Sequence, residues 1–461
     1  MHPRAFIPAF FAVVLTAAPA GAWGKGGAFK DSPHGNRETG VRRVPGLPRG
    51  DCGHCHGAAR EATGRRSDGT GHAKLFVAND NSLCAGCHLR PAGSYLGDQR
   101  YSESAHGRSP AAVWPGPVPP ARSSADAGKC VNCHDPHGVK DSRGLVPGLL
   151  RRRGVAQCLG CHRGDPAPDV SSALAKSYRH PLVADPPGAA FVSGVNAAAG
   201  PEPVATTGDA TCSACHNPHV AGQDATRPVV PGAMRSLAGV ARVRPSGGVA
   251  GGTRVFTLAA GTEISMVREF EVCFKCHSSA TRRPARGIDL AATLNPANPS
   301  FHPVEAQGRN RGIDRRAFAP GWSGERLVTC SDCHGSDDEA QRGPHGSANA
   351  HILKKRQPSG AGDQQVIETD LCFDCHAFRT YGESKAAAAY SRYTGHGSHA
   401  GKGIACWTCH DSHGSATLPA LIVLRPSALS SYSQDAGSGT CTATCHTRTP
   451  AKVSYRVSYN R

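Results

Sequence analysis

The stretch CVNCHDPHG at residues 130–138 places two thiols and two imidazoles close together. Cys130 and Cys133 are separated by two residues, and His134 follows directly. This spacing indicates a covalent c-type haem site, where both thiols bond the porphyrin and the histidine ligates the iron. His137 lies three residues further on, a reach of at most roughly 10 Å, too short to pass around the porphyrin edge. We therefore expect His137 to ligate a different haem.

The Cys-x-x-Cys-His pattern repeats along the chain and, with one longer copy, uses all 20 cysteines. A zinc site or a redox dithiol would also use paired cysteines, but neither needs a histidine directly after the second one. We therefore predict about ten haems c, with the histidine of each motif as proximal ligand. The predicted sites are Cys52/Cys55/His56, Cys84/Cys87/His88, Cys130/Cys133/His134, Cys158/Cys161/His162, Cys212/Cys215/His216, Cys273/Cys276/His277, Cys330/Cys333/His334, Cys372/Cys375/His376, Cys406/Cys409/His410 and, in the longer CTATCH, Cys441/Cys445/His446.

The remaining histidines supply candidates for the opposite face of each iron. The chain has only 3 methionines, so methionine cannot be the general second ligand, and paired histidines predict low reduction potentials. His54 lies inside the first attachment loop, and His351 is the expected spare. In YTGHGSHAG we favour His399 over His396. The predicted distal ligands are His34, His72, His106, His137, His180, His219, His302, His345, His399 and His413.

The first 22 residues have the pattern of a secretory signal, with Arg4, an apolar stretch and the small-residue site Ala20-Gly21-Ala22. The apolar stretch is shorter than the roughly 20 residues of a spanning helix. We expect an exported protein, either periplasmic, outer-membrane-associated or extracellular, with no transmembrane segment in the mature chain.

Composition predicts a thin protein core, because aromatic residues make up 6% of the chain while glycine and proline number 55 and 35. The expected fold class is a loop-rich multihaem cytochrome c with little regular secondary structure, short helices at the motifs and a core of stacked haems. The net charge of +17 could suit nucleic acid. About ten haems would bring about 20 propionates, which basic side chains pair with readily, so we predict no nucleic-acid partner.

The motifs divide the chain into two groups of five. We predict a pentahaem block at 23–219, a haem-free insert at 220–272 with a small β element around 232–272, and a second pentahaem block at 273–461. Within the insert, TRVFTL (253–258) and EISMVREFEV (263–272) have the composition of strands. The alternating tail at 451–461 suits an edge strand.

The chain resembles the multihaem c-type cytochromes with doubled CxxCH motifs. The matching pieces are CVNCHDPHG with CLGCH, CSACHNPH with EFEVCFKCHS, FHPV, GPHGS and CWTCHDSHG. The resemblance implies a wire of closely stacked haems. Its expected partners are redox proteins, such as other multihaem cytochromes, an outer-membrane porin or a terminal acceptor.

Three functions are compatible with these observations. The first is electron transfer without bond chemistry, in respiration on metals or other external acceptors. The second is a multihaem reductase of a small nitrogen or sulfur oxyanion, which needs an iron with one open face. The third is a filament-forming extracellular cytochrome. Because the histidines suffice for two ligands on every iron, the sequence favours an electron carrier that is not an enzyme.

Overall fold

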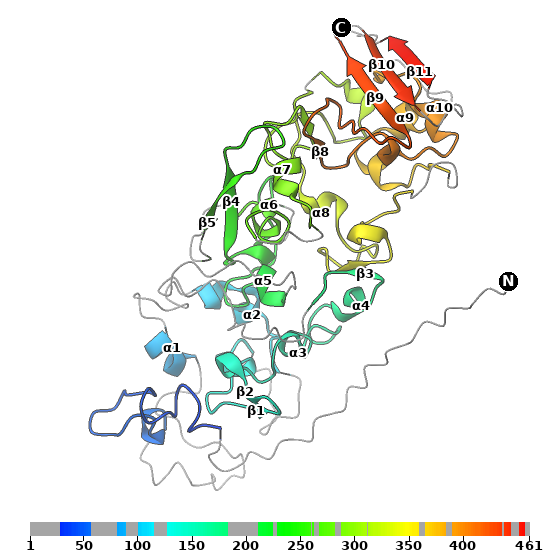
Figure 1. Cartoon of the computed structure of the whole chain (residues 1–461). Coiled ribbons are helices and arrows are strands. Elements are labelled where there is room, and N and C mark those ends of the chain that lie inside the picture. Colours follow the sequence, from blue (N-terminus) through cyan, green and yellow to red (C-terminus); the bar gives the residue numbers. More distant parts are fainter. Residues whose placement is uncertain are drawn as a thin grey trace, which may run out of the picture.

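The computed structural model describes residues 28–56, 81–88, 100–114, 127–182, 211–224, 228–259, 261, 267–281, 287–310, 312–358, 365–383, 390–435, 438–443 and 451–456. The predicted signal at 1–22, His72, Cys445 and His446 lie outside these residues. The molecule is elongated, with the first described residues (blue) near one end and strands β9, β10 and β11 (red) at the other (Figure 1). Every helix in the described part falls short of the length and apolar character that a bilayer crossing requires.

Short helices carry the first cysteine of nine motifs, as predicted. In eight of the nine regular motifs the histidine N–H donates to the carbonyl of the first cysteine, as from His134 to Cys130 (3.0 Å) and from His410 to Cys406 (3.1 Å). This bond closes one helical turn and brings both thiols to one side. These helices are η1 (Cys52–His54), α1 (Ser82–His88), η4 (Cys130–Asn132), α3 (Val155–Cys158), α5 (Cys212–Cys215), α6 (Glu269–Cys273), α8 (Cys330–Cys333), η10 (Leu371–Asp374) and η12 (Cys406–Thr408).

The expected helix is wrong for the tenth motif, because Cys441 lies in a strand. β10 (Ser438–Ala443) is the middle strand of a three-stranded antiparallel sheet, between β9 (Leu429–Gln434) and β11 (Ala451–Arg456). Threonines flank Cys441 in β10, and their branched side chains suit a strand. The alternating tail therefore forms an edge strand, as predicted, and pairs within its own chain.

The remaining helices are short and lie between the motifs. They are η2 (Arg100–Glu103), α2 (Ala105–Arg108), η5 (Pro147–Leu149), α4 (Ser171–Leu174), η6 (Arg235–Leu237), α7 (Leu290–Thr293), η8 (Arg315–Ala317), η9 (Ala350–Ile352), α9 (Phe378–Tyr381) and α10 (His396–Ala400).

The other described strands form four two-stranded antiparallel ladders. They are β1 (Lys140–Asp141) with β2 (Gly144–Leu145), β3 (Tyr178–Arg179) with β7 (Gly346–Ser347), β4 (Arg242–Ser246) with β5 (Val255–Ala259), and β6 (Ser300–Phe301) with β8 (Gly414–Ser415). Two of these ladders, β3–β7 and β6–β8, join segments more than a hundred residues apart in the sequence.

The insert contains the predicted β element, but one of its two expected strands is wrong. TRVFTL contributes to β5, whereas the described end of EISMVREFEV forms α6. Two contacts at helical spacing explain the difference: Phe270 packs on Phe274 with ring centres 5.4 Å apart, and Glu271 pairs with Arg268 at 2.6 Å. The partner of β5 is instead β4.

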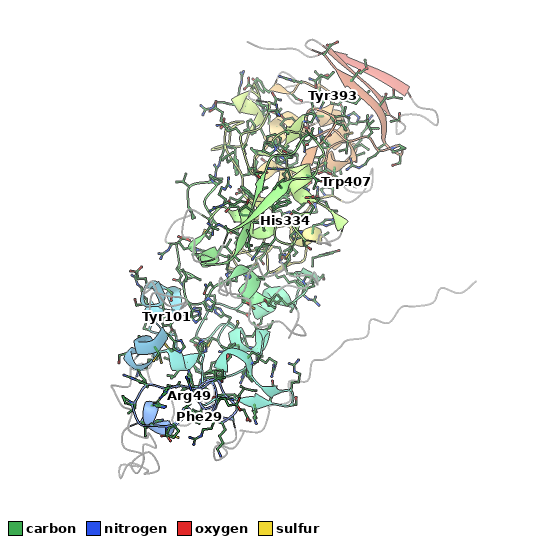
Figure 2. The ribbon with its side chains drawn as sticks, turned by 60° about the vertical axis from the view of Figure 1, so that its left-hand side comes forward. Phe29, Arg49, Tyr101, His334, Tyr393 and Trp407 are labelled. Atoms are coloured by element: carbon green, nitrogen blue, oxygen red, sulfur yellow. The ribbon has the colours of Figure 1, made fainter. Side chains whose placement is uncertain are left out.

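Protein side chains form only a small core within the described residues. The larger buried cluster contains six residues, Val243, Phe270, Phe274, Ala291, Leu294 and Val304. The smaller one contains Val366, Phe373 and Ala400. Many other side chains, from Pro33 to Ala443, line one large cavity. Figure 2 shows the described side chains along the molecule, from Phe29 near one end to Tyr393 near the other.

Candidate haem-binding sites

One continuous cavity runs through the molecule, with a volume of about 4960 Å³. Pockets for single small ligands usually have volumes of about 300–1,000 Å³, so this space suits several large groups. Each of the ten motifs contributes at least one described cysteine or histidine to its lining, from Cys55 in the first motif to Cys441 in the tenth.

Histidine rings face each other in pairs across this cavity. Each pair joins the histidine of one motif to a histidine from another segment, with ring centres 5.9–6.4 Å apart. In motif order the pairs are His56 with His137 (6.0 Å), His88 with His34 (6.1 Å), His134 with His219 (5.9 Å), His162 with His106 (6.1 Å), His216 with His345 (6.0 Å), His277 with His180 (6.3 Å), His334 with His413 (6.2 Å), His376 with His302 (6.4 Å) and His410 with His396 (6.1 Å).

This separation fits an iron atom between the two rings. A metal–imidazole bond of about 2 Å on each side, plus about 1 Å from each nitrogen to its ring centre, separates the ring centres by about 6 Å. Two imidazoles in direct contact would lie closer together. The residues present therefore suit haem iron with two axial histidines.

The structure brings eight of the ten predicted distal residues opposite a motif histidine. At the ninth motif, His396 faces His410, although the sequence favoured His399. The ring of His399 lies 5.6 Å from that of Tyr393 and lines the same cavity as Cys441. The remaining predicted distal residue, His72, lies outside the described residues.

Carbonyl groups in tight turns orient several proximal rings. The Nδ1 atoms of His134, His334 and His410 each lie 2.8 Å from a carbonyl oxygen, those of Gly148, His351 and Ala420 respectively. All three acceptors have left-handed backbone angles, with φ of 65°, 61° and 55°. Such a bond fixes the tautomer and orientation of a ligating imidazole and raises its basicity.

His351 therefore has a role that sequence reasoning missed. It was expected to be a spare side chain, but its carbonyl oxygen holds the proximal ring of the seventh motif. The segments around Gly148 and Ala420 read VPGLL and LPALI, and this recurring Pro-x-Leu pattern was the available signal. The matching segment at His351 lacks the proline, which hides the similarity.

Burial prepares the histidines for ligation by favouring their neutral form. Desolvation lowers the pKa of His219, His345 and His376 to about 4, and that of His396 to about 3. Iron binds neutral imidazole, so binding at neutral pH displaces no proton from these rings.

His54, which lies inside the first attachment loop, has a structural role. It is fully buried, and its Nδ1 accepts hydrogen bonds from the backbone N–H groups of Arg43 (3.2 Å) and Val44 (3.0 Å). Its Nε2 lies 2.9 Å from the carbonyl oxygen of Pro48, so that nitrogen carries the proton. Both ring nitrogens thus hold the loop that precedes the first motif.

Cysteines of successive motifs meet in space. Some first cysteines are close enough to interact electrostatically, namely Cys84 with Cys130, Cys158 with Cys212, Cys273 with Cys330, and Cys372 with Cys406. Between these junctions the second cysteines are electrostatic neighbours, namely Cys55 and Cys87, Cys133 and Cys161, Cys215 and Cys276, and Cys333 and Cys375. The nine described attachment sites therefore follow sequence order along the molecule.

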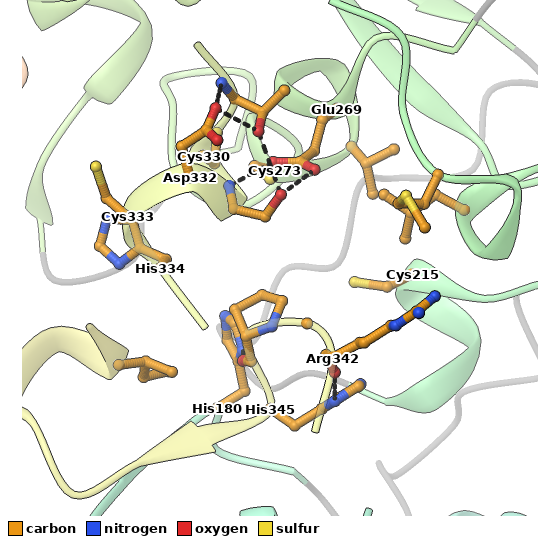
Figure 3. Close-up of a pocket in the computed structure, with 18 of the residues that line it drawn as sticks. His180, Cys215, Glu269, Cys273, Cys330, Asp332, Cys333, His334, Arg342 and His345 are labelled. Carbon is orange, nitrogen blue, oxygen red and sulfur yellow. Dashed lines mark hydrogen bonds between the residues drawn. The ribbon is translucent and has the colours of Figure 1, made fainter. Parts of the chain in front are cut away.

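One of these junctions is held by a buried carboxylate. Glu269 of α6 accepts hydrogen bonds from the backbone N–H (2.6 Å) and the hydroxyl (2.7 Å) of Ser331 in α8. The bonds tie the helix that ends at Cys273 to the helix that begins at Cys330, and Figure 3 shows the hydrogen bonds of Glu269 at this junction.

Comparison with known proteins agrees with this arrangement. Residues 123–167 match the family model of the doubled CXXCH motif, which covers the third and fourth motifs. The match confirms the predicted doubled motif in this segment, which is consistent with a multihaem c-type cytochrome. No curated protein and no solved structure matches the chain.

Proposed function

We propose that this protein transfers electrons along about ten covalently bound haems c, each held by two histidines. The observation that carries the proposal is the set of nine ring pairs with centres 5.9–6.4 Å apart. When bound, each haem supplies one reversible ferric–ferrous couple. The cysteines would anchor each porphyrin through thioethers, and the paired histidines would ligate the iron from both sides, which would leave no open face for a substrate at these nine sites.

The sequential order of the attachment sites supports conduction along the length of the molecule. Neighbouring thiols link motif 1 to motif 9 without a break. Electrons would enter near one end of the chain and leave near the other. We further propose that the protein is exported through its leader and exchanges electrons with other redox proteins in respiration on an external acceptor.

Electron paramagnetic resonance of the oxidised holoprotein, together with its mass, tests this function. We expect a mass that exceeds the mature polypeptide by ten haems and ferric signals that are almost entirely low-spin. A strong high-spin signal that shifts on adding nitrite, hydroxylamine or sulfite would support the reductase instead. Ordered fibres in electron micrographs would support the filament.

A further inference from the structure

The nine ring pairs fall into two classes that alternate along the chain. In odd-numbered motifs the two ring planes are nearly parallel or moderately inclined, and in even-numbered motifs they are steeply inclined. The odd angles are 9°, 12°, 34°, 1° and 21°, from motif 1 to motif 9. The even angles are 57°, 79°, 67° and 55°, from motif 2 to motif 8.

The hydrogen bonds of the distal histidines divide in the same way. Four of the five distal rings of odd motifs have Nδ1 contacts within their own loop. His345 contacts the Arg342 carbonyl (3.0 Å) and His396 the Tyr393 carbonyl (2.9 Å), while His137 and His413 lie 3.6 and 3.7 Å from the carboxylates of Asp135 and Asp411. Distal rings of even motifs reach a segment more than a hundred residues away. They are His34 to the carbonyl of Pro136 (3.1 Å), His106 to that of Pro218 (3.2 Å), His180 to that of Pro344 (2.6 Å), and His302 to that of Ser412.

Each of these carbonyls belongs to the residue just before an odd-motif distal histidine. We name the four tripeptides the clamps; they are Asp135-Pro136-His137, Asn217-Pro218-His219, Gly343-Pro344-His345 and Asp411-Ser412-His413. In three clamps the first side chain accepts a hydrogen bond from the histidine N–H, as Asp135 does at 3.0 Å, Asn217 at 3.1 Å and Asp411 at 2.8 Å. This bond, with a proline in three of the four clamps, fixes the direction of the middle carbonyl.

Short ladders hold the clamps beside their partners. His180 donates its backbone N–H to the His345 carbonyl (3.3 Å), next to the β3–β7 ladder. His302 donates in the same way to the His413 carbonyl (2.9 Å), next to the β6–β8 ladder. Figure 3 shows His180 and His345 side by side.

We propose that each clamp ligates the iron of one haem with its imidazole and, with its middle carbonyl, turns the distal ligand of the next haem out of the plane of its proximal partner. The proposal rests on the haem ligation proposed above. Each clamp thereby couples one odd-numbered haem with nearly parallel or moderately inclined ligand rings to the following even-numbered haem with steeply inclined rings. The coupled pairs are haems 1 and 2, 3 and 4, 5 and 6, and 7 and 8. The clamp residues other than histidine are positioning residues.

Ligand orientation has an electronic consequence. Two parallel imidazoles donate into the same iron d orbital and raise its energy, which stabilises the ferric state. Two perpendicular imidazoles donate into different orbitals, so the highest filled orbital rises less and the ferrous state is favoured. Even-numbered haems therefore have higher potentials than odd-numbered ones of equal solvent exposure, and their ferric resonance has a larger maximum g value.

The experiment is electron paramagnetic resonance of the fully oxidised holoprotein and of three variants. We expect two low-spin classes, with the large-g class carrying the four even haems. Asp135→Ala removes the hydrogen bond that fixes the carbonyl of Pro136, so the ring of His34 should no longer be held at its steep angle. Because this affects one of the four even haems, about a quarter of the large-g signal should move to the small-g class while the haem content stays unchanged. Asp135→Asn keeps the acceptor, as Asn217 does naturally, and should leave the classes unchanged.

The matched control is Asp141→Ala, because Asp141 accepts the same kind of hydrogen bond from the N–H two residues on, that of Arg143 at 2.8 Å, but no histidine is involved. Its spectrum should equal that of the parent.

If Asp135→Ala loses haem on maturation, Asp411→Ala tests the fourth clamp in the same way. A single low-spin class, or an unchanged spectrum in a fully loaded alanine variant, overturns the clamp, whereas dominant high-spin iron or missing haems overturn the proposed function itself.

Discussion

At the scale of single residues, two side-chain types do the chemistry and backbone carbonyls arrange them. The acceptors for the rings of His134, His334 and His34 are all main-chain oxygens. The direction of a backbone carbonyl is set by the backbone angles of its turn. The orientation of each ring therefore depends on turn geometry and not on the side chain of the acceptor residue. Asp135 and Asn217 occupy equivalent clamp positions with different charge, which offers a way to tune neighbouring irons individually.

His137→Met should raise the potential of one haem. The ring of His137 faces that of His56, so the change replaces one axial ligand of the first haem, and Met/His ligation raises the potential. The backbone carbonyl of Pro136 remains, so the second haem should keep its steep ring angle. A spectroelectrochemical titration measures the shift, with Lys140→Met in the same loop as control. Movement of the entire titration curve would contradict this assignment.

At the scale of elements, the segment predicted to be a haem-free insert braces the middle of the molecule. Glu271 of α6 is 1% exposed and bonds the fully buried Arg242 of β4 at 3.0 Å, while Arg268 approaches its other oxygen at 2.6 Å. Because α6 ends at Cys273, this ion cluster connects the β4–β5 hairpin to the sixth attachment site.

Glu271→Ala should destabilise the holoprotein by about 3–5 kcal/mol, because it removes a buried counter-charge from the fully buried Arg242. Denaturant unfolding, with haem content checked first, measures the loss. Asp31→Ala breaks the exposed pair with Lys140, and its cost should stay within about 1 kcal/mol. Equal losses in the two variants would mean that the insert does not brace the fold.

At the scale of the whole molecule, the interior is a space rather than a packed core. The described side chains form two small buried clusters, beside a cavity of about 4960 Å³. The pairs His180–His277 and His216–His345 also join residues on both sides of the insert, so the two predicted pentahaem blocks share their central sites. The folding free energy must then come largely from bound haem.

The chain produced without haem should be expanded. Small-angle X-ray scattering of apoprotein, made without its leader in the cytoplasm and kept reduced, should give a radius of gyration approaching the roughly 80 Å of an unfolded chain of this length. The matured holoprotein is the comparison. An apoprotein as compact as the holoprotein would show that side-chain packing alone determines the fold.

The sequence by itself determined the chemistry, because covalent attachment depends on local spacing. A thiol pair and its adjacent histidine lie within one turn, so the nine regular motifs, their helices and the inability of His137 to serve its own haem could all be predicted from neighbouring residues. The edge strand at Ala451–Arg456 was predictable for the same reason, since alternation is a local pattern.

Only the tertiary structure decided which histidines meet. His180 and Pro344 are 164 residues apart, and no local pattern specifies such a partner. The choice of His396 over His399, the role of the His351 carbonyl and the helix at Glu269–Cys273 all depend on contacts with distant segments. Ligand type is a property of single residues, whereas ligand pairing and ring angle are properties of how loops pack around a shared interior.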